Sequence, residues 1–355
     1  MDLSDESEVC EATENITRII LSFKRKWPTK DWEKYGFFNE KYLLKINSYW
    51  LQFPPPPMIS HYILGVLYFF IMVIGASGNL VFIVMFIRRK SLRTPSNIFI
   101  MNLAVSDLFL MLKMPIFIYN SFLLGPAMGD FGCSFYGFFG GLTGTASIMT
   151  LSAIAFDRYQ VIGNPLARKL KHRIYFQILF IWLYSAFFAT IPLLDIGLNR
   201  YVPEGYLTSC SFDYLSEDYG SRILIVVFFI AAWVVPVSVI ITSYTAIYKI
   251  ILKTQKKNAF EGRHCKKMNA RNSEIKAAFV IMAIICLWIF AWTPYAVVAL
   301  LGVTGNKKYI TPMASMIPAL FCKLASCIDP YVYAIANTRF RKEFRVAIST
   351  RASPL

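Results

Sequence analysis

The stretch PALFCKLASCIDPYVY, residues 318–333, places a single lysine, Lys323, inside an otherwise apolar segment. The polar ends of that segment lie about ten residues away on either side, which is roughly 15 Å along a helix at about 1.5 Å per residue. A lysine side chain cannot reach either end from that depth. The stretch therefore predicts a membrane-spanning helix with one buried amine. Such a group is by default functional and faces the interior of a helix bundle.

Long apolar runs recur along the rest of the chain. With 56% apolar, 16% aromatic and only 16% charged residues, the sequence is too hydrophobic for a soluble protein of 355 residues. Each run is long enough to cross a bilayer as a helix, which satisfies its own backbone hydrogen bonds in lipid. The runs lie at 62–87, 97–121, 133–157, 174–195, 222–248, 275–302 and 312–335. The sequence therefore predicts an all-α membrane protein, a bundle of seven transmembrane helices.

The formal net charge of +16 is concentrated on one side of this predicted bundle. Lysines and arginines crowd the connections after the first, third, fifth and seventh runs, whereas the loop 196–220 on the other side holds acids. Basic loops remain in the cytoplasm, so the amino terminus is expected outside. This distribution argues against a nucleic-acid partner. We expect a loosely structured extracellular arm at 1–60, the seven-helix domain at 61–336, and a cytoplasmic amphipathic helix with a short tail at 337–355.

Two of the seven cysteines are placed to pair. Cys133 opens the third run at the outer face, and Cys210 lies in the long second outer loop, so both belong to the oxidising compartment. A bridge between them would pin the loop over the bundle as a lid; the alternative is two unrelated thiols. The triplet that begins at Asn15 is a glycosylation sequon on the outer face. We expect no metal site.

Each predicted helix carries one short motif, and the motifs follow one another in order. They are Gly78-Asn79, Leu103-Ala104-Val105-Ser106-Asp107, Asp157-Arg158-Tyr159, Trp182, Pro236, Trp292-Thr293-Pro294-Tyr295 and Asp329-Pro330-Tyr331-Val332-Tyr333. Taken together, the motifs resemble those of the rhodopsin-like G-protein-coupled receptors over residues 62–348.

Charges at the cytoplasmic ends of the third and sixth helices suggest a latch. Arg158 stands beside Asp157, and Glu274 begins the sixth helix at the same depth. An arginine held by two carboxylates would keep the helices closed, and its release would open an inner cavity for a partner. The resemblance implies this role, and implies that Tyr244 and Tyr333 move toward the freed arginine. The alternative is that these charges only fix topology. The remaining residues assigned to coupling and activation are Tyr159, Pro294 as a hinge, Asp329 and Pro330.

The resemblance also explains Lys323. It precedes Pro330 by seven residues, the spacing that marks opsins, in which this lysine binds retinal as a Schiff base. Desolvation favours the neutral, nucleophilic amine that imine formation with an aldehyde requires. A purely structural ion pair is the alternative. The implied cofactor is 11-cis retinal or 3-hydroxyretinal.

A protonated imine in a buried site needs a negative partner. Tyr136 stands three residues after Cys133, where vertebrate visual pigments have a glutamate. Glu204, six residues before Cys210, matches the loop glutamate that serves as counterion in invertebrate opsins. The alternative is that Glu204 is a solvated loop acid.

The second helix contains another lysine, Lys113. The segment 111–122 around it resembles arthropod ultraviolet opsins, as does the loop 201–214. A second cation near the imine would repel its proton, and an unprotonated imine absorbs at shorter wavelength. Lys113 is therefore expected to tune the protein to ultraviolet or short-wavelength light, unless it pairs with a carboxylate such as Asp107. The resemblance places Gly144, Trp292 and Tyr295 against retinal, although aromatic stripes more often serve packing.

The resemblance implies a light-activated receptor in the plasma membrane of photoreceptor cells. We expect it to signal through a heterotrimeric G protein, with the Gq type favoured over the others. We also expect regulation by arrestin and a receptor kinase. Light supplies the energy, so the protein is expected to be a switch and not an enzyme. Two alternatives stay open: a retinal photoisomerase on the same fold, and a receptor for a diffusible ligand, which would have no reason for Lys323. The Asp157-Arg158-Tyr159 motif and Glu274 favour signalling.

Overall fold

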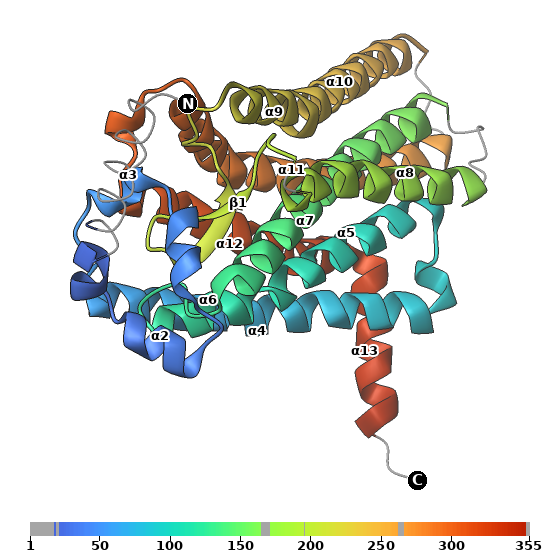
Figure 1. Cartoon of the computed structure of the whole chain (residues 1–355). Helices are drawn as coiled ribbons and strands as arrows, with labels where there is room; N and C mark the ends of the chain where they lie inside the picture. Colours follow the sequence, from blue (N-terminus) through green and yellow to red (C-terminus); the bar gives the residue numbers. More distant parts are fainter. Residues whose placement is uncertain (1–17, 19–20, 165–170, 195, 262–265, 353–355) are drawn as a thin grey trace.

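The computed structural model describes residues 18, 21–164, 171–194, 196–261 and 266–352, which form a helical bundle (Figure 1). Its long helices are α4 (Met58–Arg88), α5 (Pro95–Leu112) with α6 (Met114–Phe122), α7 (Gly129–Gly163), α8 (Lys171–Thr190), α9 (Tyr219–Phe229) with α10 (Val235–Glu261), α11 (Lys266–Val303) and α12 (Pro312–Ala336). Among the described residues, six helices are each long and apolar enough to cross a membrane, and the bent pair of α12 and α13 (Thr338–Ala352) gives a seventh. The predicted fold class is confirmed. Asn15 lies outside the described residues.

Two prolines interrupt the helices beside the centre of the bundle. Pro115 has no N–H to donate to the carbonyl of Met111, so α5 stops and α6 begins. Lys113 lies at this break, and its backbone N–H donates a hydrogen bond to the carbonyl of Met111. Between α9 and α10, the π-helical turn η4 (Ile230–Val234) precedes Pro236 and accommodates the missing backbone bond in the same way.

The central helix of the bundle is α7. It packs against α5, α8, α10 and α11, and its buried residues join the main hydrophobic core. Leu151 of α7, Phe99 of α5 and Trp288 of α11 are almost fully buried in this core. Trp288 also lines the main cavity between the helices, which lies next to this core and beneath the second outer loop.

That loop forms a β-hairpin over the outer end of α7. Strands β1 (Tyr201–Glu204) and β2 (Ser209–Phe212) pair antiparallel, with Glu204 opposite Ser209. Cys210 of β2 forms a disulfide with Cys133, which confirms the predicted bridge. The turn needs Gly205, whose φ is +56° and whose Cβ would lie 2.4 Å from the hydroxyl of Ser315. The disulfide and the close approach of Gly205 to α12 hold the hairpin in place as a lid over the bundle.

The amino-terminal arm differs from the loose segment that the sequence suggests. Its described part folds into α2 (Thr29–Tyr35), the 3-10 helix η1 (Glu40–Lys45) and α3 (Ser48–Leu51). Trp32 is fully buried and donates its indole N–H to the carbonyl of Leu123 at 2.6 Å. The arm covers the outer loops because part of its apolar side chains, among them Trp32, Phe38 and Trp50, pack into one buried cluster with the second outer loop, whereas others such as Phe37 remain exposed.

Removal of the Trp32 side chain should destabilise the whole outer face. We expect Trp32→Ala to cost about 3 kcal/mol, the usual loss for a buried aromatic residue, and to lower the apparent melting temperature of the purified protein. Phe37→Ala is the matched control, because Phe37 lies in the same segment and is 69% exposed. Equal melting temperatures for both variants would show that the arm contributes nothing to stability.

Candidate functional site

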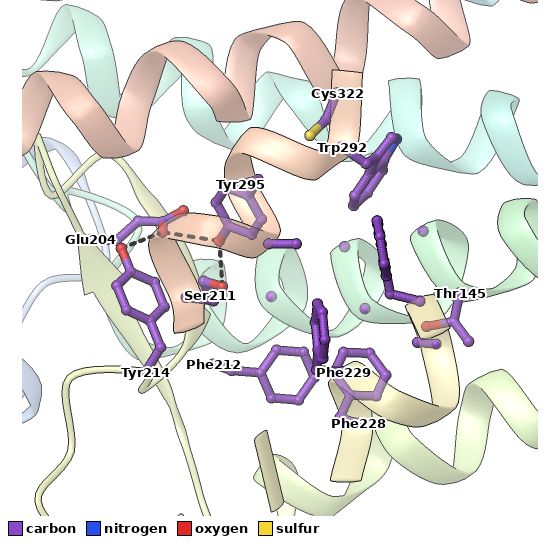
Figure 2. A pocket seen from close by; sticks show the side chains of 18 of the residues that line it. Thr145, Glu204, Ser211, Phe212, Tyr214, Phe228, Phe229, Trp292, Tyr295 and Cys322 are labelled. Atoms are coloured by element: carbon purple, nitrogen blue, oxygen red, sulfur yellow. Dashed lines mark hydrogen bonds between the residues drawn. The ribbon is translucent and has the colours of Figure 1, made fainter. Parts of the chain in front are cut away.

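A mostly apolar cavity lies beneath the hairpin, between α7, α11, α12 and the α9–η4 segment (Figure 2). Glu204 and Tyr214 stand at one side of it, whereas Thr145 and Phe228 stand at the other. Both buried lysines, Lys113 and Lys323, belong to its lining. The cavity therefore brings together groups from six separate parts of the chain.

The two lysines share one aromatic ring. Lys113 Nζ lies 4.0 Å from the centre of the Tyr136 ring and donates to the Tyr136 carbonyl at 3.2 Å. Lys323 Nζ lies 6.0 Å from the same ring centre. In the part of the chain that the structure describes, neither amine forms an ion pair. The ring face attracts cations, but two positive charges this close repel each other.

Glu204 is buried in the lid and only 3% exposed. Its carboxylate accepts hydrogen bonds from the hydroxyls of Tyr295 (3.0 Å), Tyr214 (3.2 Å) and Ser209 (3.4 Å). Burial raises the pKa of the Glu204 carboxyl, while the charge of Lys323 and the tyrosine hydroxyls oppose that rise. Glu204 is therefore an enclosed carboxyl group that interacts with the charge of Lys323 over a distance. It is not a solvated loop acid.

Two residues of this network carry no clear signal in the sequence. Tyr214 donates to Glu204, and the hydroxyl of Tyr295 lies 2.6 Å from Ser211 Oγ (Figure 2). Ser211 and Tyr214 belong to the loop 201–214, but no motif in that loop assigns either of them a role. Only the register of the hairpin, which the sequence does not reveal, would have placed them beside Glu204.

Lys113 does not pair with Asp107, which was the alternative to spectral tuning. Asp107 instead accepts from the hydroxyl of Ser147 at 3.3 Å and lines a separate small cavity with Asp329. Both carboxyl oxygens of Asp329 and one of Asp107 find no hydrogen-bond partner among the described residues. Asp107 therefore does not neutralise Lys113, whose amine faces the main cavity.

The inner wall of the cavity depends on glycine and on stacked indoles. A Cβ added at Gly144 would lie 2.6 Å from the Trp292 ring, so only glycine lets the indole approach α7 this closely. Trp292 stacks on Trp288 with ring centres 5.1 Å apart. The Trp292 ring is therefore confined on the sides of Gly144 and Trp288, and its remaining free side faces the cavity.

At the cytoplasmic end the structure joins the groups of the expected latch. Arg158 contacts Asp157 at 2.5 Å and Glu274 at 2.8 Å. Tyr244 donates to the carbonyl of Ala278, and Tyr333 to the side chain of Asn97. Among the described contacts, both tyrosines therefore have partners other than Arg158, and the ion pair between Arg158 and Glu274 is formed. The other assigned residues lie nearby or within the same helices: Tyr159 is half-buried, Pro294 lies inside α11, and Asp329 and Pro330 lie inside α12.

Comparisons with known proteins agree with this geometry. Residues 78–333 match the family model of the 7 transmembrane receptor (rhodopsin family). The ultraviolet-sensitive opsin of Apis mellifera is 39% identical over 312 residues, which is 85% of this chain and 84% of that protein. Opsin Rh4 of Drosophila melanogaster is 41% identical over 312 residues, which is 84% of this chain and 82% of that protein. The crystal structure of squid rhodopsin superposes with a TM-score of 0.81 at 33% identity and covers 87% of this chain and 91% of that one.

Such relatives imply a retinal chromophore, and the residues of the cavity fit one. The lining is dominated by aromatic side chains and glycines, as an apolar polyene with a ring requires. The amine of Lys323 is buried at its edge without an ion-pair partner in the described chain, which leaves it available to an aldehyde. Glu204 supplies an acid in the same enclosure.

The family match spans most of the membrane bundle, and the relatives cover more than four fifths of the chain. The chain is therefore a multi-pass integral membrane protein of the rhodopsin family of seven-transmembrane receptors and, within that family, belongs to the opsins, the light-sensing receptors that couple to heterotrimeric G proteins.

Proposed function

We propose that this opsin is a light-activated receptor for ultraviolet or short-wavelength light that carries 11-cis retinal, or 3-hydroxyretinal, on Lys323. The observation that carries the proposal is a single unpaired amine on α12, within the described chain, that lines an aromatic cavity closed by a disulfide-held lid. The amino terminus is outside, the membrane is that of a photoreceptor cell, and the partners are a G protein of Gq type, arrestin and a receptor kinase. Asn15 would be glycosylated on that outer side.

When bound, retinal supplies a polyene that light isomerises and an aldehyde that condenses with an amine as a Schiff base. Lys323 holds the attachment point, and Glu204 provides the compensating negative charge. Tyr214 and Tyr295 keep that carboxylate in place through their hydroxyls. The hairpin excludes bulk water, which strengthens each of these electrostatic interactions.

Lys113 supports the assignment to short wavelengths. Because Lys113 Nζ and Lys323 Nζ face the same Tyr136 ring, a positive charge on the Lys323 nitrogen is disfavoured. Glu204 acts in the opposite direction, since it favours that charge. The protonation state of the Lys323 nitrogen thus depends on the balance between the Glu204 carboxylate, which favours the proton, and the Lys113 cation, which repels it.

Activation proceeds through the inner wall of the cavity. A push on Trp292 cannot be absorbed by α7 at Gly144, so α11 swings at Pro294. The swing separates Glu274 from Arg158 and opens the cytoplasmic face for the G protein. Tyr244 and Tyr333 then exchange their present partners for the freed arginine.

The latch predicts a specific change in basal signalling. Glu274→Gln should raise G-protein activation in darkness about threefold, because an ion pair with one partly exposed member contributes roughly 0.5–1 kcal/mol. Nucleotide exchange on a purified G protein measures this. Glu343→Gln is the control, since Glu343 pairs with Arg89 and makes no contact with Arg158. Equal basal rates for both variants would remove the latch from the mechanism.

The proposed function is tested by reconstitution with 11-cis retinal. The spectrum should show a band at ultraviolet or short wavelength that shifts on acid denaturation, and illumination of the membranes should start nucleotide exchange on a G protein. Photoconversion without any exchange would instead favour the photoisomerase. A protein that forms no pigment, and responds to a soluble ligand, would favour the receptor for a diffusible ligand.

A further inference from the structure

A groove outside the retinal cavity runs along the side of the bundle where α4, α12 and α13 meet. Val81 of α4, with Tyr331 and Ala334 of α12, forms its apolar walls, and Phe344 and Arg341 of α13 complete it. The hydroxyl of Tyr331 donates to the α4 carbonyl of Ile74 at 2.8 Å, which holds the two walls together. The groove is therefore a fixed feature of three packed helices.

The position of the groove corresponds to the cytoplasmic leaflet. From Val81, α4 continues roughly 10 Å to its inner end at Arg88, at about 1.5 Å per residue. There α13 leaves α12 at 88° and projects away from the bundle beneath α4 (Figure 1). The apolar walls consequently stand at the depth of acyl chains, while α13 lies at the depth of headgroups.

One cation stands at the headgroup end of this groove. Arg341 is exposed, lines the groove, and donates from one nitrogen to the carbonyl of Ile335 at the end of α12. The acid of the same helix, Glu343, is engaged elsewhere, since it pairs with Arg89 and accepts from Ser91 at 2.6 Å. The groove is thus apolar within the membrane and positive at its surface.

We propose that this groove binds an anionic phospholipid of the cytoplasmic leaflet, with an acyl chain between α4 and α12 and the phosphate on Arg341. An amphipathic groove of this kind matches a lipid better than a free anion, because most of its surface is apolar. Anionic lipids are enriched in the cytoplasmic leaflet, where basic segments attract them. α13 carries no cysteine, so no acyl chain attached to it can occupy the groove.

Native mass spectrometry of the full chain, released from nanodiscs of phosphatidylcholine with phosphatidylserine, tests the proposal. The wild-type protein should retain phosphatidylserine in preference to phosphatidylcholine. Arg341→Gln should lower that retention about tenfold, the effect of one lost charge-assisted contact. Lys342→Gln removes the same charge from the neighbouring position, which does not line the groove, and should leave retention unchanged.

A second pair of variants tests the acyl chain. Val81→Trp fills the groove and should lower retention of phosphatidylserine, whereas Val84→Trp, on the same exposed side of α4 but outside the groove, should not. Three outcomes would overturn the proposal. They are equal loss with Arg341→Gln and Lys342→Gln, which indicates diffuse attraction; equal retention of both lipids; and displacement by glycerophosphoserine, which has no acyl chains.

Discussion

Lys323→Ala should leave a folded protein that holds no covalent chromophore. The cavity and its lid remain, but the amine that attaches the aldehyde is gone. Retinal added to the variant should wash out completely, and the absorption band of the bound pigment should be absent. Light-dependent nucleotide exchange should fall to the level measured without retinal.

Lys113→Ala is the matched control for this experiment. Lys113 is the other buried lysine of the same cavity, and its amine lies closer to the Tyr136 ring than that of Lys323. The Lys113 variant should still hold retinal covalently. Loss of the pigment in both variants would mean that the mutations damage the cavity in general, and retention in Lys323→Ala would place the attachment elsewhere.

Lys113→Met should move the absorption maximum from the ultraviolet or short-wavelength range to longer wavelength. The substitution keeps an unbranched side chain of similar length but removes the cation that repels a proton from the Lys323 nitrogen. Glu204 is then the remaining charged group of the cavity, and it favours the protonated form. The spectrum of the reconstituted pigment measures the shift.

Lys308→Met provides the comparison for this shift. Lys308 also stacks over a tyrosine ring, at 4.8 Å from the centre of Tyr309, but on the outer surface away from the cavity. Its removal should leave the spectrum unchanged. An unchanged spectrum in Lys113→Met as well would show that the second lysine has no influence on colour, and the ultraviolet assignment would lose its physical basis.

The fold and the proposed attachment site at Lys323 follow from strong local patterns in the sequence. A run of apolar residues has to be a helix in a membrane, and a lysine at mid-depth has to face inward, so neither inference depends on tertiary detail. Cys133 and Cys210 could be paired because both lie at the outer end of the bundle and neither lies deep in a membrane helix. These predictions do not depend on the details of how the helices pack against one another.

The partners of Glu204 could not be predicted in this way. They depend on the register of a hairpin that is set by the disulfide and by the contact of Gly205 with α12. The folded structure of the amino-terminal arm could not be predicted either, because Trp32 and its neighbours show no helical or strand period and stand among charged residues. Their burial arises only when the outer loops of the bundle are present to receive them.

Reduction with borohydride followed by peptide mass spectrometry identifies the side chain to which retinal is attached. The reagent converts an imine of retinal into a stable amine on the side chain that carried it. We expect one modified peptide, with the added mass on Lys323. A pigment whose retinal is found on Lys113, on any other side chain, or on none, would contradict it.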